Sequence, residues 1–293
     1  MRKIYLLCAL LCLIFMFGCE NSDIKIDETP ISDFEYENVD NNITITRYIG
    51  TDIHIVIPAK IKNVKVTEIG PACFENALVE SVTLPSTIKI IGASAFEGCS
   101  ALEDVIFPQE LSKIKARAFA DCISLRAITI PSDCIDEFSW EVFCGSGLET
   151  VIFDGNIKII PNNAFLGTKL KEIILPASVK TIEFGAFSGC ENLESIKLNE
   201  GLETIEVCAF ASNPKLTEII IPKTVKSVNE FAFVNCNNLV KVKFEGNAPA
   251  FQNKDAGLEE IYSYFTPKYT IYYHIDAEGF TSPSWEGFLS EIW

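Results

Sequence analysis

Phenylalanine recurs at a nearly constant interval through most of the chain, and this repeat limits the possible folds more than any other feature. Successive copies are 22, 23, 24, 22, 22, 23 and 23 residues apart. Each has an apolar residue five positions before the phenylalanine and usually alanine directly before it. Units of this length cannot bury their own apolar side chains, whereas stacked units close a continuous core. The sequence therefore predicts a solenoid with one structural phenylalanine in each of eight coils: Phe74, Phe96, Phe119, Phe143, Phe165, Phe187, Phe210 and Phe233.

The segment after each phenylalanine has the pattern of a short strand. Leu or Val is followed three residues later by Ile or Val, and another apolar residue comes two positions beyond, as in Leu170, Ile173 and Leu175. Alternation at period two predicts a strand with one buried face. A second apolar pair, such as Val179 and Ile182, predicts another short strand on the opposite side of the coil. No window has the sustained 3.6-residue period of a proper helix, so we expect a β-rich solenoid with two short strands per coil and little helix.

This frame, I-x-x-x-A-F-x-x-C-x-x-L-x-x-I-x-L-P, resembles that of the bacterial BspA-like leucine-rich repeat proteins of the treponemal type. The resemblance covers residues 41 to 290, from "NNITITRYIGTDIHIVIPAKIKNVKVTEIG" to "TIYYHIDAEGFTSPSWEGF". It implies a right-handed leucine-rich repeat superhelix. It also implies a cell-surface or periplasmic protein that adheres to host matrix proteins or to other cells. On this basis we expect a capping repeat over 41–68, the solenoid over 69–247 and an aromatic C-terminal cap over 248–293.

The first residues have the layout of a secretory signal. Two cations precede an apolar run from Ile4 to Phe17, which is too short for a membrane span of about 20 residues. Phe17-Gly18-Cys19 resembles a lipobox, although Met16 stands where leucine is usual. We therefore expect a signal peptide over 1–18, lipidation of Cys19 and a lipid anchor to a bacterial membrane, the outer membrane or cell surface being favoured. Residues 20–40 hold eight acidic side chains and one lysine, which predicts a solvated linker.

Charge and residue types argue against nucleic-acid binding and against catalysis. The formal net charge is -16, and phosphate binding needs clustered positive charge. The two histidines, His54 and His274, flank the repeats at opposite ends, so neither can serve as a base beside a repeat Ser or Cys. There is no C-x-x-C, and we expect neither a metal nor a cofactor.

Cysteine is frequent at one position of the repeat. Of 11 cysteines, Cys8 and Cys12 belong to the expected signal and Cys19 is the expected lipid site, which leaves eight. Four of them lie three residues after the repeat phenylalanine, where other copies have Ala, Ser, Thr or Asn. The favoured interpretation is a ladder of reduced, buried thiols. A Cys99–Cys122 disulfide is the alternative, because equivalent positions on adjacent coils lie about 5 Å apart.

The strand face is the candidate binding surface. Four isoleucines stand among the eight outward positions, which suggests an apolar stripe that contacts a protein partner. The alternative is the ordinary preference of strands for β-branched residues. Glutamates flank most of the coils, so a partner would meet an acidic rim. The outward residues are Thr83, Ile106, Thr129, Ile152, Ile174, Lys197, Ile220 and Lys243.

Two irregular segments leave further alternatives open. The fourth copy is one residue longer and adds Trp140, which would either line a binding loop or fill space beside the insertion. The tail from Tyr262 to Trp293 holds ten aromatic residues and is expected to cap the open end, with glycan binding as the alternative. A periplasmic scaffold for a bacterial partner is the other alternative to a cell-surface adhesin.

Overall fold

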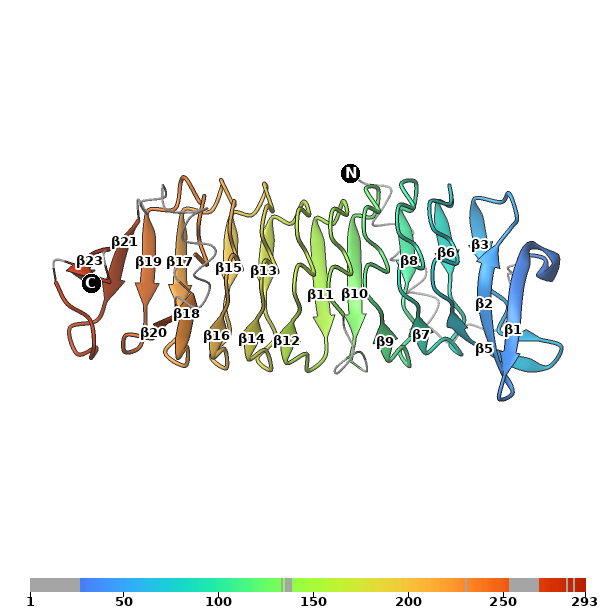
Figure 1. The fold of residues 1–293 in the computed structure, drawn as a ribbon, viewed down its shortest axis with the longest axis horizontal. Coiled ribbons are helices and arrows are strands. Elements are labelled where there is room, and N and C mark those ends of the chain that lie inside the picture. Colours follow the sequence, from blue (N-terminus) through green and yellow to red (C-terminus); the bar gives the residue numbers. More distant parts are fainter. Residues whose placement is uncertain are drawn as a thin grey trace, which may run out of the picture.

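The protein is one elongated solenoid of short strands that run across its long axis (Figure 1). The computed structural model describes residues 27–132, 134, 139–229, 231–252, 269–282, 284–286 and 288–293. The expected signal peptide, Cys19 and residues 20–26 lie outside the described residues. Within the described part of the chain, the single helix is the three-residue η1 (Ile31–Asp33), and no helix is long and apolar enough to cross a membrane.

One side of each coil carries the strand that follows the phenylalanine. Neighbouring strands pair in parallel, for example Thr129 with Ile152 and Ile220 with Lys243. Burial alternates along them because adjacent side chains of a strand point to opposite faces. The strands are β3 (His54–Val56), β6 (Ser81–Thr83), β8 (Asp104–Ile106), β10 (Ala127–Pro131), β11 (Thr150–Asp154), β13 (Glu172–Ile174), β15 (Ser195–Lys197), β17 (Glu218–Ile221), β19 (Lys241–Phe244), β21 (Thr270–Tyr273) and β23 (Phe288–Ile292).

A second sheet forms on another side from the apolar pair before each phenylalanine. Its strands in the repeats are mostly two residues long and again parallel, so the prediction of two short strands per coil is confirmed. The strands are β5 (Val64–Ile69), β7 (Ile90–Ile91), β9 (Lys113–Ile114), β12 (Ile159–Ile160), β14 (Thr181–Ile182), β16 (Thr204–Ile205), β18 (Ser227–Asn229) and β20 (Ala250–Gln252).

The turns around the phenylalanines form a third ladder of hydrogen bonds between coils, which the sequence pattern does not reveal. The Phe96 N–H donates to the Ala118 carbonyl at 2.8 Å, and the Phe119 N–H to the Val142 carbonyl at 2.9 Å. Residues two before and two after the phenylalanine have left-handed φ in most coils, as in Arg117 (57°) and Asp121 (58°). This alternation turns the N–H groups of every second residue toward the next coil. Gly, Asn and Asp at the second of these positions suit that backbone, because they adopt left-handed φ most readily.

The repeat phenylalanines form one stacked column in the core. Their ring centroids are 4.9–5.7 Å apart and neighbouring rings are within 20° of parallel. All eight side chains are at most 4% exposed. The column continues into the ends of the molecule, where Tyr48 stacks on Phe74 at 5.2 Å and Tyr269 meets Phe233 edge-on at 6.3 Å. Aromatic stacking therefore ties the ends to the repeats.

The N-terminal end is closed by a hairpin of β1 (Phe34–Val39) and β2 (Asn42–Tyr48). The expected linker over 19–40 is wrong for residues 34–39, which form β1 despite their acidic composition. Phe34 is 5% exposed and its ring lies 5.6 Å from Tyr48, so burial of apolar side chains outweighs the charge of Glu35 and Glu37 on the exposed face. A second hairpin joins β4 (Lys60–Ile61) to β5.

At the C-terminal end, β21 and β23 extend the first sheet beyond the repeats, and β22 (Ser284–Trp285) pairs antiparallel with β23. Tyr269 and Phe288 stack at 5.3 Å, and both side chains are buried. Part of the aromatic tail, residues 253–268, lies outside the described residues.

Candidate binding face on the strand side

The outward residues of the first sheet form a single column along the solenoid. Thr83 pairs with Ile106, Thr129 with Ile152, Ile174 with Lys197, and Ile220 with Lys243. The four isoleucines are exposed by 41–60%, although each is a large apolar side chain. They occupy the same outward position of repeat strands that lie side by side along the solenoid (Figure 1), so the outward residues define a linear surface, which we call the strand face.

Ion pairs between coils neutralise part of the acidic rim expected beside the strand face. The lysine Nζ lies 2.5 Å from a carboxylate oxygen in the pair Lys171–Glu149, 3.0 Å in Lys243–Glu218 and 3.8 Å in Lys215–Glu194. Each pair joins a residue to its neighbour one coil away. The rim is therefore a mixed row of paired charges rather than a uniformly acidic border.

The C-terminal end of the strand face is aromatic, which the outward positions of the repeats alone did not indicate. Tyr272 pairs with Lys243 in register, and the Lys243 ammonium lies 5.5 Å from the ring centroid of Trp293. Trp293 in turn lies 4.5 Å from His274. The Lys243 side chain is only 21% exposed, because it is held between Glu218 and Trp293. The signal for this extension is the alternation in Ile271-Tyr272-Tyr273, which continues the repeat strand into the tail.

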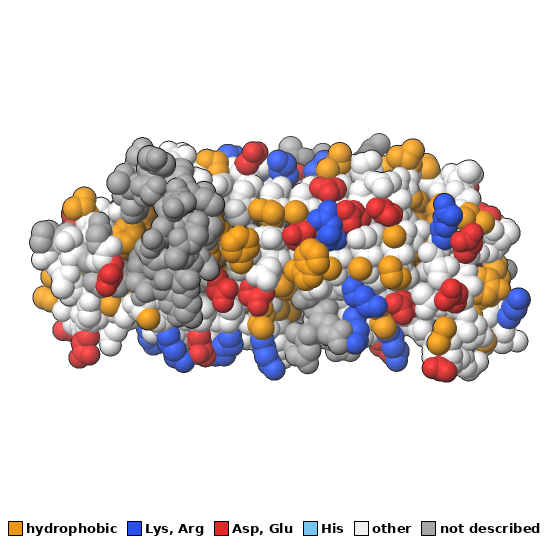
Figure 2. All heavy atoms as spheres, in the orientation of Figure 1, with side chains coloured by type: hydrophobic (Ala, Val, Ile, Leu, Met, Phe, Trp, Pro, Cys, Tyr) orange, Lys and Arg blue, Asp and Glu red, His pale blue; other side chains and the backbone are white. Residues whose placement is uncertain are grey.

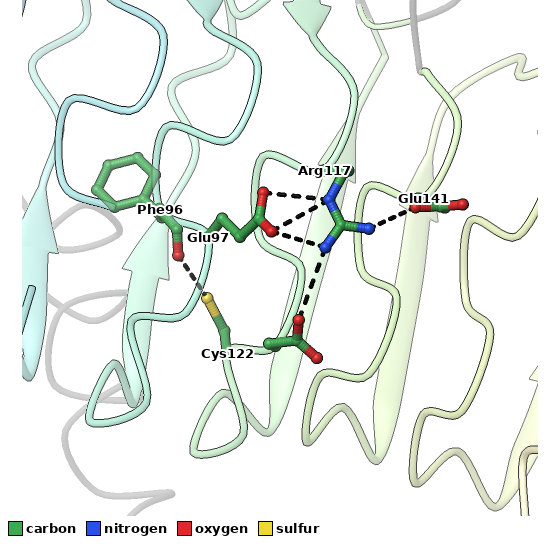
Figure 3. Close-up of polar contacts among 6 residues, drawn as sticks. Phe96, Glu97, Arg117, Cys122 and Glu141 are labelled. Carbon is green, nitrogen blue, oxygen red and sulfur yellow. Dashed lines mark hydrogen bonds and ion pairs between the residues drawn. The ribbon is translucent and has the colours of Figure 1, made fainter. Parts of the chain in front are cut away.

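The repeat cysteines are hydrogen-bond donors rather than merely small core residues. Cys99 Sγ donates to the Phe74 carbonyl at 2.9 Å, and Cys122 Sγ donates to the Phe96 carbonyl at 3.1 Å (Figure 3). Cys190 and Cys236 make the same bond one coil back, and Asn213 Nδ2 donates to the Phe187 carbonyl at 3.0 Å. The position therefore takes a short side chain, and Cys and Asn there donate to the coil before, whereas Thr168 donates to the Phe165 carbonyl of its own coil at 3.0 Å.

Burial makes these thiols poor nucleophiles. Desolvation raises the pKa of Cys99 to about 12 and that of Cys190 and Cys236 to about 11. A reactive thiol needs a lowered pKa. His54 lies in β3 and His274 follows β21, so both are at the ends of the solenoid, away from the repeat thiols. The described residues hold no group of His, Cys, Asp and Glu arranged to bind a metal.

Arg117 crosslinks three successive coils on the turn side (Figure 3). Its Nε donates to both carboxylate oxygens of Glu97 at 3.1 Å, and its Nη1 donates to Glu141 at 2.5 Å. Asp121 lies 3.7 Å away. The hydrogen bonds from Arg117 lower the pKa of Glu97. Because carboxylates surround the guanidinium, this cluster connects the coils and leaves no group of Arg117 available to bind a ligand.

Trp140 is 49% exposed and thus does not fill a core cavity beside the insertion. Phe184, at the same repeat position two coils later, is 42% exposed. Both lie three residues before a repeat phenylalanine, on the turn side. The described part of the fourth copy therefore adds an exposed aromatic surface separate from the strand face.

Stacked parallel coils with a buried aromatic column and an outward strand face define a leucine-rich repeat solenoid. The model of the BspA type leucine-rich repeat region, of six copies, matches residues 67–183 and 158–255. The chain belongs to this BspA-type leucine-rich repeat family. Among curated proteins, none matches it.

The chain is also similar to solved structures of bacterial leucine-rich repeat proteins. One from Bacteroides ovatus is 23% identical with a TM-score of 0.57, over 86% of this chain and 71% of the other. The leucine-rich repeat protein of T. pallidum is 27% identical with a TM-score of 0.44, over 74% and 86%. A leucine-rich cell surface protein from Faecalibacterium prausnitzii is 19% identical with a TM-score of 0.40, over 76% and 89%. The likeness to the B. ovatus structure concerns the solenoid fold alone.

Proposed function

We propose that this chain is an exported, non-catalytic binding protein that is lipid-anchored through Cys19 and presents its strand face to a protein partner at the cell surface. The partner is a host matrix protein or a component of another cell. The observation that carries the proposal is the row of exposed isoleucines at the outward position of successive repeat strands. Exposed apolar side chains in a row, bordered by charges of both signs, are typical of a protein-binding surface.

Substitution on the strand face tests the binding site. The variant Ile152→Asp/Ile174→Asp places two carboxylates at the centre of the column, and Ile123→Asp is its matched control because Ile123 is as exposed as Ile152, at 56%, but lies outside a strand. The purified protein is applied to an array of extracellular matrix proteins. We expect the double variant to lose binding by at least about a hundredfold, because buried unpaired charges at an interface cost several kcal/mol. Equal binding by the double variant and the wild type would rule out the strand face.

The location is tested separately on intact cells. Protease added outside the cells should remove the protein if it is at the surface, whereas a periplasmic scaffold would be protected. Replacement of Cys19 by Ala should abolish incorporation of labelled fatty acid and release the protein from the membrane fraction. Unchanged labelling of that variant would contradict the lipid anchor.

A further inference from the structure

A hollow of about 540 Å³ lies at the N-terminal end of the second sheet. Its lining includes Asn42 of β2, Lys65 and Thr67 of β5, Thr87 and Lys89 of the next coil, and Glu110 of the coil after that. The volume falls within the range of about 300 to 1,000 Å³ that is usual for small-molecule sites. None of these residues belongs to the strand face.

The hollow exists because β5 is longer than the repeat strands beside it. β5 pairs with β7 only at Glu68 and Ile69, so the residues before Glu68 extend past the start of β7. The hairpin with β4 holds this overhang in place through a turn at Lys62 and Asn63, both with left-handed φ. Two left-handed residues in a two-residue loop are typical of a rigid β-hairpin turn. The overhang and the short turn of the next coil thus border the hollow.

The lining of the hollow has a net positive charge. Lys65 and Lys89 are exposed, and neither has an ion pair within the described residues. Several other lysines of the solenoid pair with a glutamate of another coil, such as Lys180 with Glu203 one coil away and Lys115 with Glu68 two coils away, both at 3.2 Å. Two lysines and one glutamate give the hollow a formal charge of +1, in a chain whose net charge is -16. Hydroxyl and amide groups of Thr67, Thr87 and Asn42 make up much of the remaining lining.

Lysines also gather along the lower edge of the molecule in the view of Figure 2. Lys158 occupies the repeat position of Lys89, seven residues before the phenylalanine, and is likewise exposed. Lys158 does not line the hollow. Lys158→Ala is therefore a control for the loss of an exposed lysine outside the hollow.

We propose that this hollow binds a sugar acid with one negative charge, such as a hexuronate or a sialate. Its carboxylate lies between the ammonium groups of Lys65 and Lys89, where charge-assisted hydrogen bonds are strongest. Asn42, Thr67 and Thr87 bind the sugar hydroxyls, and the Glu110 carboxylate accepts a further hydroxyl. Glu110 also disfavours small polyanions, because it leaves the lining with a single net positive charge. The proposal is independent of the strand face and of the expected protein partner.

Calorimetric titration of the purified full-length protein with glucuronic acid and with N-acetylneuraminic acid tests the site, with glucose and inorganic phosphate as controls. We expect at least one of the two acids to bind with a Kd below about 10 mM, and glucose and phosphate to bind at least about tenfold more weakly. Lys65→Ala/Lys89→Ala should weaken that binding by at least about tenfold, whereas Lys158→Ala should leave it unchanged. All three lysines are exposed, so the variants should fold, which circular dichroism verifies.

Three results would overturn the proposal. The first is no binding of either acid in this concentration range. The second is equal binding of glucose or of phosphate. The third is unchanged affinity of the Lys65→Ala/Lys89→Ala variant for an acid that the wild type binds.

Discussion

Replacement of Phe187 by alanine should be among the most destabilising single changes in the molecule. The ring is fully buried, and it stacks on Phe165 at 5.3 Å and on Phe210 at 5.6 Å. A buried Phe→Ala change costs about 3 to 5 kcal/mol, and each aromatic pair contributes about 0.5 to 1.5 kcal/mol beyond its buried area. Because Phe187 has a stacked ring on each face, we expect the free energy of unfolding to fall by about 4 to 5 kcal/mol, the upper end of that range.

Denaturant unfolding followed by circular dichroism measures this loss, and Phe184→Ala is the matched control in the same coil. Phe184 is 42% exposed, so its removal should cost about 1 kcal/mol or less. Phe187→Leu keeps most of the apolar volume without the ring and should cost about 1.5 kcal/mol, which gives a readout if the alanine variant does not fold. A difference of less than about 1 kcal/mol between Phe187→Ala and Phe184→Ala would refute the stacked column as the main source of stability.

Three further predictions concern the polar groups between coils. Asn213→Ala should lower the free energy of unfolding by about 1 to 3 kcal/mol, because it removes the side-chain donor to the buried Phe187 and Phe210 carbonyls, whereas the exposed Asn237→Ala should have little effect in the same measurement. Burial raises the pKa of the Cys99, Cys190 and Cys236 thiols from the ordinary value of 9.0. The free energy of unfolding should therefore be unaffected by these thiols below pH 9.0 and should fall as pH rises toward about 11 to 12. A free energy of unfolding that stays constant across that pH range would contradict this prediction. Arg117→Met should lower the free energy of unfolding by about 1 to 2 kcal/mol at neutral pH, since it leaves Glu97 and Glu141 without their cation. Because the pKa of Glu97 is lowered from 4.5, the contribution of this cluster should fade in the wild type as pH falls below 4.5, and the variant should lack that part of the acid dependence.

The period of the phenylalanines was sufficient to predict the solenoid and its two short strands per coil, because spacing and alternation depend only on which side chains are buried. The period did not predict the third ladder of hydrogen bonds. That ladder depends on left-handed φ at residues such as Arg117 and Cys208, which a pattern of apolar residues does not reveal. Composition gave a wrong prediction at β1. The charges of Glu35 and Glu37 indicated a linker, whereas burial of Phe34 stabilises a strand there.

For the candidate site, sequence spacing identified the outward positions but not their neighbours. The four isoleucines are exposed as the alternation indicated. The contacts of Lys243 with Glu218 and Trp293 arise from residues 25 and 50 positions away, and only the folded register brings them together. The hollow beside β5 was equally hidden, because it results from a difference in strand length between neighbouring coils.

The ladder of turn hydrogen bonds gives the solenoid a direction. In each described coil that has a described successor, alternate N–H groups point to the following coil and the accepting carbonyls point back. The two ends are therefore chemically opposite. The first coil presents carbonyl acceptors to the N-terminal cap, and the Cys73 carbonyl accepts from the Tyr48 N–H at 2.9 Å. The last coil presents donors, which require acceptors. The two caps are consequently not interchangeable, and a transplanted or duplicated coil can join the stack only in one polarity. A head-to-head dimer through bare ends would set like groups against each other, so end-to-end association of such coils should be head-to-tail.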